Sequence, residues 1–209
     1  GTTVSGGIVT IRIRSDFPTD AAARQAMDDT VRQIETCLGR LVFGRGDDTL
    51  WQIVADLLKA RGRTVATAES CTGGLVAKLL TDIPGSSAFF KGGWVVYSNR
   101  MKSQELGVPP ELIERYGAVS EAVARSMAEQ ACHRAESDYA LALTGIAGPD
   151  GGSAEKPVGT VWIALARRTV AGVTVTADCG NLPGARDMVR DRAAKTALNM
   201  LRLELMEKE

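Results

Sequence analysis

Between residue 47 and the end of the chain, short apolar segments typical of strands alternate with amphipathic segments typical of helices. The expected helices are residues 47–62, 74–83, 99–107, 109–117, 120–137 and 185–208. The expected strands are residues 64–69, 92–98, 138–145, 160–168 and 173–180. Because interleaved helices must cover both faces of a sheet, this order predicts an α/β protein built as a three-layer α/β/α sandwich. The last two strands are joined by a short turn typical of an antiparallel hairpin, so the sheet should be mixed.

The first 46 residues differ from this pattern. Residues 7–16 alternate apolar and charged side chains as an exposed strand does, residues 19–39 form an expected helix, and residues 40–44 are a short apolar segment. These elements predict a small β-α-β segment that is too small for a core of its own. We therefore expect two domains, residues 1–46 and 47–209, with the chemistry in the second.

Charge and hydropathy exclude several classes of protein. Lysine plus arginine and aspartate plus glutamate both number 25, and this neutral balance argues against binding to nucleic acid through phosphate neutralisation. No apolar segment is long enough to span a membrane, and the amino terminus lacks the layout of a signal peptide. Four widely spaced cysteines without a C-x-x-C motif indicate reduced thiols and a cytoplasmic location rather than a disulfide framework.

The histidine content narrows the possible chemistry further. His133 is the only histidine, and it lies in an expected helix. A Ser-His-Asp hydrolase needs a histidine held by a buried acid, and a zinc hydrolase usually needs two or three histidines. Any hydrolytic reaction should therefore proceed without histidine and, we expect, without a metal.

Open α/β sheets bind ligands at the carboxyl ends of their strands, and the first candidate loop there is ESCTGG, residues 69–74. Thr72, Gly73 and Gly74 could present a hydroxyl and backbone N–H groups to an anion at the start of a helix. The same residues would equally suit a capped helix whose glycines allow close packing. The motif alone leaves both interpretations open.

The second candidate combines GSS, residues 85–87, with YSNRMK, residues 97–102. Serine attacks a carbonyl only if a base removes its proton, and without histidine a lysine held neutral by its surroundings is the available base. Ser87, Tyr97 and Lys102 around one strand end would make a Ser-Lys centre in which the tyrosine passes protons or orients the lysine. A turn serine and a solvated lysine would explain the same residues.

The third candidate is LTGIAGPDGG, where Thr144 ends an apolar strand and Gly145 and Gly148 allow a ligand to approach the backbone. The following loop, residues 146–159, is long enough to act as a lid, or it could simply connect two strands. Arg186 and Arg190 lie one helical turn apart and could bind a phosphate or be solvated.

Four segments carry a resemblance to a known family. TVATAESCTGG, DIPGSSAFFKGGWVVYSNRMK, GAVSEAVARSMA and TGIAGPDGGSAEKPVGTVWIALA closely resemble the C-terminal domain of the CinA competence/damage-inducible proteins, over about residues 48–205. Residues 1–46 resemble the end of the middle region of longer CinA proteins. The resemblance implies a sandwich of the anticodon-binding-like type. It also implies hydrolysis of nicotinamide mononucleotide to nicotinate mononucleotide and ammonia, without cofactor or metal.

The resemblance also implies roles for individual residues. It places the nucleophile on Ser87, the base on Lys102 and an assisting role on Tyr97, although Ser70 at its polar turn competes for the part of nucleophile. The residues expected to contact substrate are Ser70, Thr72, Gly73, Gly74, Asn99, Thr144, Gly145, Gly148 and Arg186. The alternative function is a non-catalytic module for nucleotide sensing or partner docking. The sequence allows a homodimer without requiring one.

Overall fold

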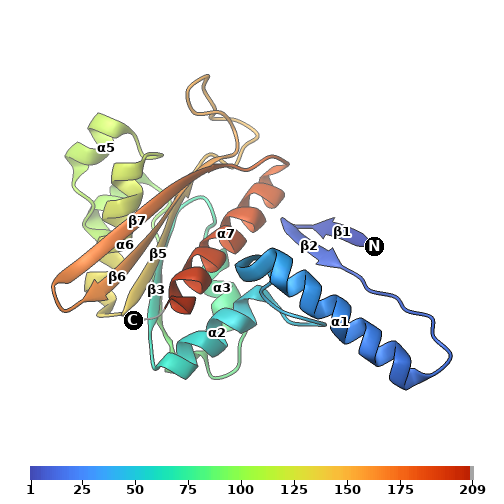
Figure 1. The fold of residues 1–209 in the computed structure, drawn as a ribbon. Coiled ribbons are helices and arrows are strands. Elements are labelled where there is room, and N and C mark those ends of the chain that lie inside the picture. Colours follow the sequence, from blue (N-terminus) through green and yellow to red (C-terminus); the bar gives the residue numbers. More distant parts are fainter. Residues whose placement is uncertain (208–209) are drawn as a thin grey trace. The chain divides into compact units, whose positions relative to one another are not determined.

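The structure is a computed structural model that describes residues 1–207 (Figure 1). It divides into two compact units, the first spanning Gly1–Asp48 and the second starting at Thr49. The boundary lies within two residues of the one expected from the sequence.

The first unit is a β-hairpin followed by a helix. Strands β1 (Thr2–Ser5) and β2 (Ile8–Ile11) pair in antiparallel fashion, and helix α1 (Asp20–Leu38) follows. The expected β-α-β order is wrong here, because residues 39–44 form a 3₁₀ turn, η1 (Gly39–Leu41), and irregular backbone instead of a second strand. The two glycines at residues 6–7 both adopt positive φ, which is what a tight hairpin turn requires.

The second unit contains a five-stranded sheet in the order β4-β3-β5-β6-β7. Three parallel strands, β4 (Phe90–Val95), β3 (Val65–Glu69) and β5 (Tyr139–Gly145), occupy one side. An antiparallel hairpin, β6 (Thr160–Thr169) and β7 (Gly172–Asn181), completes the other. The predicted mixed sheet and its terminal hairpin are confirmed.

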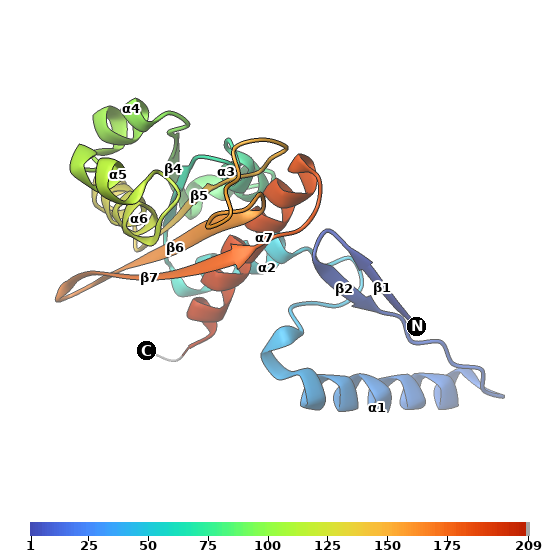
Figure 2. The ribbon, with the colours of Figure 1, turned by 90° about the horizontal axis from the view of Figure 1, so that it is seen from above.

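Helices cover both faces of this sheet, as Figures 1 and 2 show. One face carries α6 (Glu121–Ala135) together with α5 (Pro110–Tyr116) and the π-helical turn η3 (Lys102–Leu106). The other carries α2 (Leu50–Arg61), α3 (Leu75–Thr81) and α7 (Arg186–Met206). The three-layer sandwich is therefore confirmed. The observed helices begin or end up to three residues inside the predicted bounds, as α2 does, and Lys208, the last residue predicted for the final helix, lies outside the described residues.

Strand β5 explains how one sheet serves two different helix layers. Its buried residues alternate between alanine and leucine, and Ala140 and Ala142 belong to the cluster that packs against α6. Leu141 and Leu143 point to the opposite face, since successive side chains of a strand alternate. Small residues let α6 approach the sheet closely, and the leucines fill the space on the other side.

The three parallel strands matter most for function. Their carboxyl ends meet at one edge of the sheet, which we call the carboxyl edge, and the turns at residues 70–74, 96–102 and 145–151 all leave from it. In the part of the chain that the structure describes, no helix is both long enough and apolar enough to span a membrane.

Candidate active site

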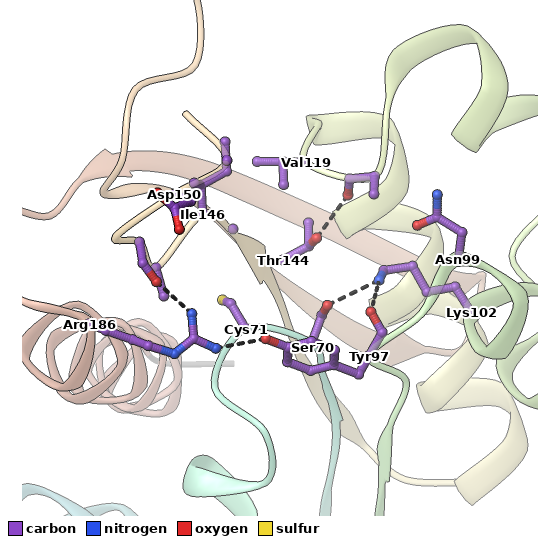
Figure 3. A pocket seen from close by; sticks show the side chains of 15 residues that line it. Ser70, Cys71, Tyr97, Asn99, Lys102, Val119, Thr144, Ile146, Asp150 and Arg186 are labelled. Atoms are coloured by element: carbon purple, nitrogen blue, oxygen red, sulfur yellow. Dashed lines mark hydrogen bonds between the residues drawn. The ribbon is translucent and has the colours of Figure 1, made fainter. Parts of the chain in front are cut away.

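A pocket of about 280 Å³ lies at the carboxyl edge of the sheet (Figure 3). Its walls come from the turns that follow β3, β4 and β5, from residues 118–119 between α5 and α6, and from Arg186 at the start of α7. The predicted ligand position at the carboxyl ends of the parallel strands thus coincides with a cavity.

The pocket contains a buried serine–lysine pair. Ser70 directly follows β3, and its backbone N–H donates a hydrogen bond to the carbonyl oxygen of Leu143 on β5. Lys102 begins η3, and its side chain turns back over the end of β4 so that Nζ lies 3.0 Å from Ser70 Oγ. The two residues are 8% and 1% exposed, so water has little access to their polar atoms.

The other contacts of Lys102 fix the orientation of its amine. Nζ lies 3.1 Å from the carbonyl oxygen of Val96 and 3.3 Å from that of Tyr97. Burial lowers the pKa of Lys102 below its ordinary value, because the charged form is poorly solvated there. A neutral amine can donate to both carbonyls and direct its lone pair at the Ser70 hydroxyl. This is the arrangement that a general base requires.

Two backbone N–H groups follow Ser70 in the same turn. In the described chain, the N–H groups of Cys71 and Thr72 donate to no oxygen atom. Burial raises the pKa of the Cys71 thiol to about 11, although both N–H groups lie close enough to favour the thiolate. Cys71 is therefore a neutral thiol in the pocket wall, and its own N–H remains as a donor for a ligand, whereas Thr72 is fully buried and does not line the pocket.

The turn that carries Ser70 is held by residues outside the pocket. The carboxylate of Glu69 accepts hydrogen bonds from the backbone N–H groups of Val76 (3.0 Å) and Ala77 (2.8 Å) at the start of α3. The sequence interpretation gave Glu69 no role, although a carboxylate before a helix is a recognised capping signal. On the other side of the turn, Arg190 Nη2 donates to the Thr72 carbonyl at 2.8 Å.

The predicted anion cradle takes a different form in the structure. Thr72, Gly73 and Gly74 do not line the pocket of the described chain. Thr72 is buried, and the two glycines have φ values of 60° and 93° that allow the chain to turn from β3 into α3. These three residues shape the turn, and its pocket-facing residues are Ser70 and Cys71.

The structure does not bring Ser87 to Lys102. Ser87 is exposed in the 3₁₀ turn η2 (Ser86–Ala88), which precedes β4 at its amino end, whereas Lys102 folds over the carboxyl end. The six residues of β4 separate the two positions, a length of roughly 20 Å. The interpretation of Ser87 as the nucleophile thus loses its geometric basis, and Ser70, the competing serine, occupies the position beside the amine.

Tyr97 lines the pocket, but its contacts differ from those expected. Its backbone carbonyl holds Lys102, while its hydroxyl accepts a hydrogen bond of 2.7 Å from Nη2 of Arg186. Nη1 of the same arginine donates to the carbonyl of Gly148, also at 2.7 Å. Arg186 therefore joins the turn after β4 to the loop after β5, and it places a guanidinium group at the pocket (Figure 3).

The remaining predicted contact residues, Asn99, Thr144 and Gly145, all line the pocket. Thr144 is buried at the end of β5, and its hydroxyl donates to the carbonyl of Ala118 at 2.8 Å, which fixes the wall formed by residues 118–119. A Cβ atom on Gly145 would lie 2.8 Å from the backbone oxygen of Thr160, so only glycine fits.

Sequence reasoning missed several residues of the pocket. Asp150 lies in the wall formed by the loop after β5, and it provides a negative charge in the same pocket as Arg186. Ala118 and Val119 carry no chemical signal in the sequence, because they contribute apolar surface only. Among the described residues, no group of three or more His, Cys, Asp or Glu side chains is placed to hold a metal ion, and His133 is exposed on α6.

The fold and the pocket together define a class: an α/β protein with a buried serine–lysine pair at the carboxyl edge of a mixed sheet. Comparison with known proteins gives the family. The model of the CinA C-terminal domain matches residues 47–205. The chain therefore belongs to the CinA C-terminal domain family.

Relatives of two lengths share this domain. The Escherichia coli (strain K12) nicotinamide-nucleotide amidohydrolase PncC is 53% identical over 158 residues, which cover 74% of this chain and 94% of that protein. A putative competence-damage inducible protein of Symbiobacterium thermophilum is 52% identical over 83% of this chain but only 42% of its own length. The chain thus spans about half the length of the longer curated relatives it matches.

The solved structures agree with this assignment. A competence/damage inducible protein, CihA, from Agrobacterium tumefaciens superimposes with a TM-score of 0.70 at 40% identity, over 78% of this chain and all of that one. A CinA superfamily protein from Klebsiella pneumoniae 700603 gives a TM-score of 0.71 at 35% identity, over 75% of this chain and 95% of that one.

Proposed function

We propose that the protein hydrolyses the carboxamide of nicotinamide mononucleotide, releasing ammonia and nicotinate mononucleotide, with Ser70 as nucleophile and Lys102 as general base. The observation that carries the proposal is the 3.0 Å contact between Lys102 Nζ and Ser70 Oγ inside the pocket. The choice of substrate is supported by the similarity to a nicotinamide-nucleotide amidohydrolase along nearly its whole length.

The first half of the reaction forms an ester on the enzyme. The neutral amine of Lys102 takes the proton of Ser70 while Oγ attacks the carboxamide carbon. The carbonyl oxygen becomes an oxyanion, for which the backbone N–H of Cys71 is the available donor. The Lys102 ammonium then returns its proton to the departing nitrogen, the C–N bond breaks, and ammonia leaves.

The second half uses the same groups with water. Lys102, neutral again, takes a proton from a water molecule that attacks the ester carbon, and the resulting oxyanion accepts from the same N–H donor. Collapse breaks the bond to Ser70 Oγ, and the proton on Lys102 passes back to the serine. The products are nicotinate mononucleotide and a free enzyme in its starting protonation state.

Charge in the pocket suits this substrate. The nucleotide carries a phosphate, and we assign Arg186 as its counter-ion, because the guanidinium lines the pocket and offers paired donors. We also propose a cytoplasmic location and a role in recycling pyridine nucleotides. The former is supported by the four cysteines, all of which are unpaired.

The proposal is tested by incubating the protein with nicotinamide mononucleotide. Ammonia is measured in a coupled assay and nicotinate mononucleotide by chromatography, with and without a chelator. We expect equimolar products in both conditions, and no product from Lys102→Met. An absence of product at high enzyme concentration would favour the sensing module instead, and product that disappears with chelator would contradict a metal-independent centre.

A further inference from the structure

We propose that Arg190 is a positioning residue for the proposed amidase reaction, acting through the turn at residues 70–74 that carries Ser70 and the Cys71 N–H. The sequence allowed two roles for this arginine, a phosphate ligand beside Arg186 or a solvated side chain. The structure indicates a third. Arg190 is half-buried and does not line the pocket of the described chain, and its Nη2 atom donates to the carbonyl of Thr72.

The contact with Thr72 fixes one particular peptide plane. The peptide that joins Thr72 to Gly73 has its carbonyl held by Arg190 at 2.8 Å and its N–H held by the carbonyl of Ser70 at 3.1 Å. A peptide group is planar, so restraint at both ends defines its rotation. The preceding residues of the same turn carry the Ser70 side chain and the Cys71 N–H, so restraint of this peptide limits the directions that both groups can take.

The environment of Gly73 supports a close and specific contact. A Cβ atom on Gly73 would lie 3.5 Å from Arg190 Nη2, so the guanidinium lies against the glycine backbone. Gly73 has a φ of 60° and no side chain to stiffen the turn. The hydroxyl of Thr72 is buried without a hydrogen-bond partner among the described residues and therefore does not hold the turn.

The other restraints on the turn act mainly at its two ends. The backbone N–H of Ser70 is tied to Leu143 of β5, and Glu69 is tied to the start of α3. At the centre, the Thr72 carbonyl accepts a hydrogen bond of 2.8 Å from Arg190 Nη2 and a longer one of 3.4 Å from the Leu75 N–H, so Arg190 supplies the shorter of the two. We therefore expect loss of the guanidinium to misalign Ser70 and the Cys71 N–H while the pocket and its phosphate ligand remain.

Steady-state kinetics on nicotinamide mononucleotide separates this role from phosphate binding. We expect Arg190→Met to lower kcat by about 100-fold, the loss that a misplacement of about 1 Å can cause. KM and the inhibition constant of nicotinate mononucleotide should stay within about twofold, because ground-state binding is retained. Arg190→Lys should lie between wild type and Arg190→Met, since its ammonium can still donate to the Thr72 carbonyl.

A matched control comes from the same helix. Lys195 lies on α7 outside the pocket and pairs with Asp191 at 2.8 Å, so Lys195→Met removes a cation of α7 without touching the turn. We expect Lys195→Met to keep the kcat of wild type. A rise in KM of Arg190→Met at unchanged kcat would identify Arg190 as a phosphate ligand, and a kcat equal to that of Lys195→Met would also overturn the proposal.

Hydrogen–deuterium exchange tests the same contact without any assay of activity. Arg190→Met should exchange faster than wild type in the peptide containing residues 70–74, while peptides from β5 and α6 should exchange as in wild type. Unchanged exchange at residues 70–74 would overturn the positioning role. If the wild-type protein releases no ammonia, the proposed function fails, and the exchange result alone decides whether Arg190 restrains the turn.

Discussion

Two serine-containing turns of this chain each contact a lysine side chain from another element. They lie at opposite edges of the same sheet, one at the carboxyl edge and the other at the amino edge, where the parallel strands begin. At the carboxyl edge, Ser70 lies 3.0 Å from the amine of the buried Lys102. At the amino edge, Ser87 is exposed, and the nearby Lys59 donates to the carbonyl of Pro84 and lies over the ring of Phe89. Both turns contain glycine and serine, yet only one adjoins a pocket.

The difference shows what the sheet contributes to the chemistry. At the carboxyl edge, the turns after three parallel strands converge, so Lys102 meets carbonyl acceptors, a hydroxyl and N–H groups in one enclosed space. At the amino edge, Lys59 is exposed to solvent and does not line the pocket. The position relative to the strand ends, rather than the residue types, separates a candidate catalytic centre from an ordinary turn.

Exchanging the two serines for alanine tests this comparison directly and carries the largest expected effect. Ser70→Ala should lower kcat for nicotinamide mononucleotide by at least about 10⁴-fold, as loss of a catalytic nucleophile does. Ser87→Ala should retain the activity of wild type, since Ser87 does not line the pocket. Ammonia release measures both variants. Full activity of Ser70→Ala together with an inactive Ser87→Ala would restore the interpretation drawn from the sequence.

The pH dependence of the reaction compares the two lysines. Because burial lowers the pKa of Lys102, its neutral form persists to lower pH than that of an exposed lysine. We expect kcat/KM to fall about tenfold per pH unit below that lowered pKa, as the base becomes protonated. Lys102→Arg should be inactive at every pH, because a guanidinium stays charged. Lys59→Arg should keep the wild-type profile, and loss of the acidic limb in that variant would contradict the role of Lys102.

Arg186 tests whether substrate phosphate is bound at the carboxyl edge. Hydrogen bonds to charged groups contribute about 1.5–3 kcal/mol, so Arg186→Met should raise KM by roughly 10- to 150-fold with a smaller change in kcat. The matched control is Arg192→Met, two positions from Arg190 on the same helix and outside the pocket, which should leave KM unchanged. Equal KM values for wild type and Arg186→Met would place the phosphate elsewhere.

The structural roles of the two turns predict a difference in stability. Glu69 is fully buried and accepts two backbone N–H groups, and Glu69→Gln would turn an amide NH₂ group toward one of these donors. One buried N–H then lacks a partner, which costs about 1–3 kcal/mol in the free energy of unfolding. Ser87→Ala, at the exposed turn, should change it by less than about 0.5 kcal/mol. Urea denaturation followed by circular dichroism measures both, and equal stabilities would show that Glu69 does not hold the turn.

The sequence predicted much of this arrangement, for identifiable reasons. Strand and helix periodicity gave the three layers, and the rule for open sheets gave the edge that holds the pocket. Lys102, Thr144 and Arg186 followed from polar residues at strand and helix ends. The serine that pairs with Lys102 could not be chosen from residue types. The choice between Ser70 and Ser87 depends on which end of the strands each turn adjoins, and this is a property of the topology. The sequence left the role of Arg190 open between phosphate binding and solvation, because its observed partner is a backbone carbonyl far away in the sequence.

The smallest predicted effect is the pH dependence of stability that Lys102 confers. Its pKa in the folded protein is below the ordinary value of 10.5, so between these two values the unfolded chain binds more protons than the native one. The free energy of unfolding should therefore rise with pH across this window, because the cost of burying the amine is present below the lowered pKa and vanishes near 10.5. Lys102→Met cannot gain a proton, so the stability of wild type relative to this variant should increase with pH.

Urea denaturation of wild type, Lys102→Met and the reference Lys59→Met at several pH values measures the difference. The result that contradicts this prediction is a stability difference between wild type and Lys102→Met that stays constant or falls as pH rises. The Lys102 amine would then be as well solvated as that of Lys59, and the comparison between the two turns would lose its electrostatic basis.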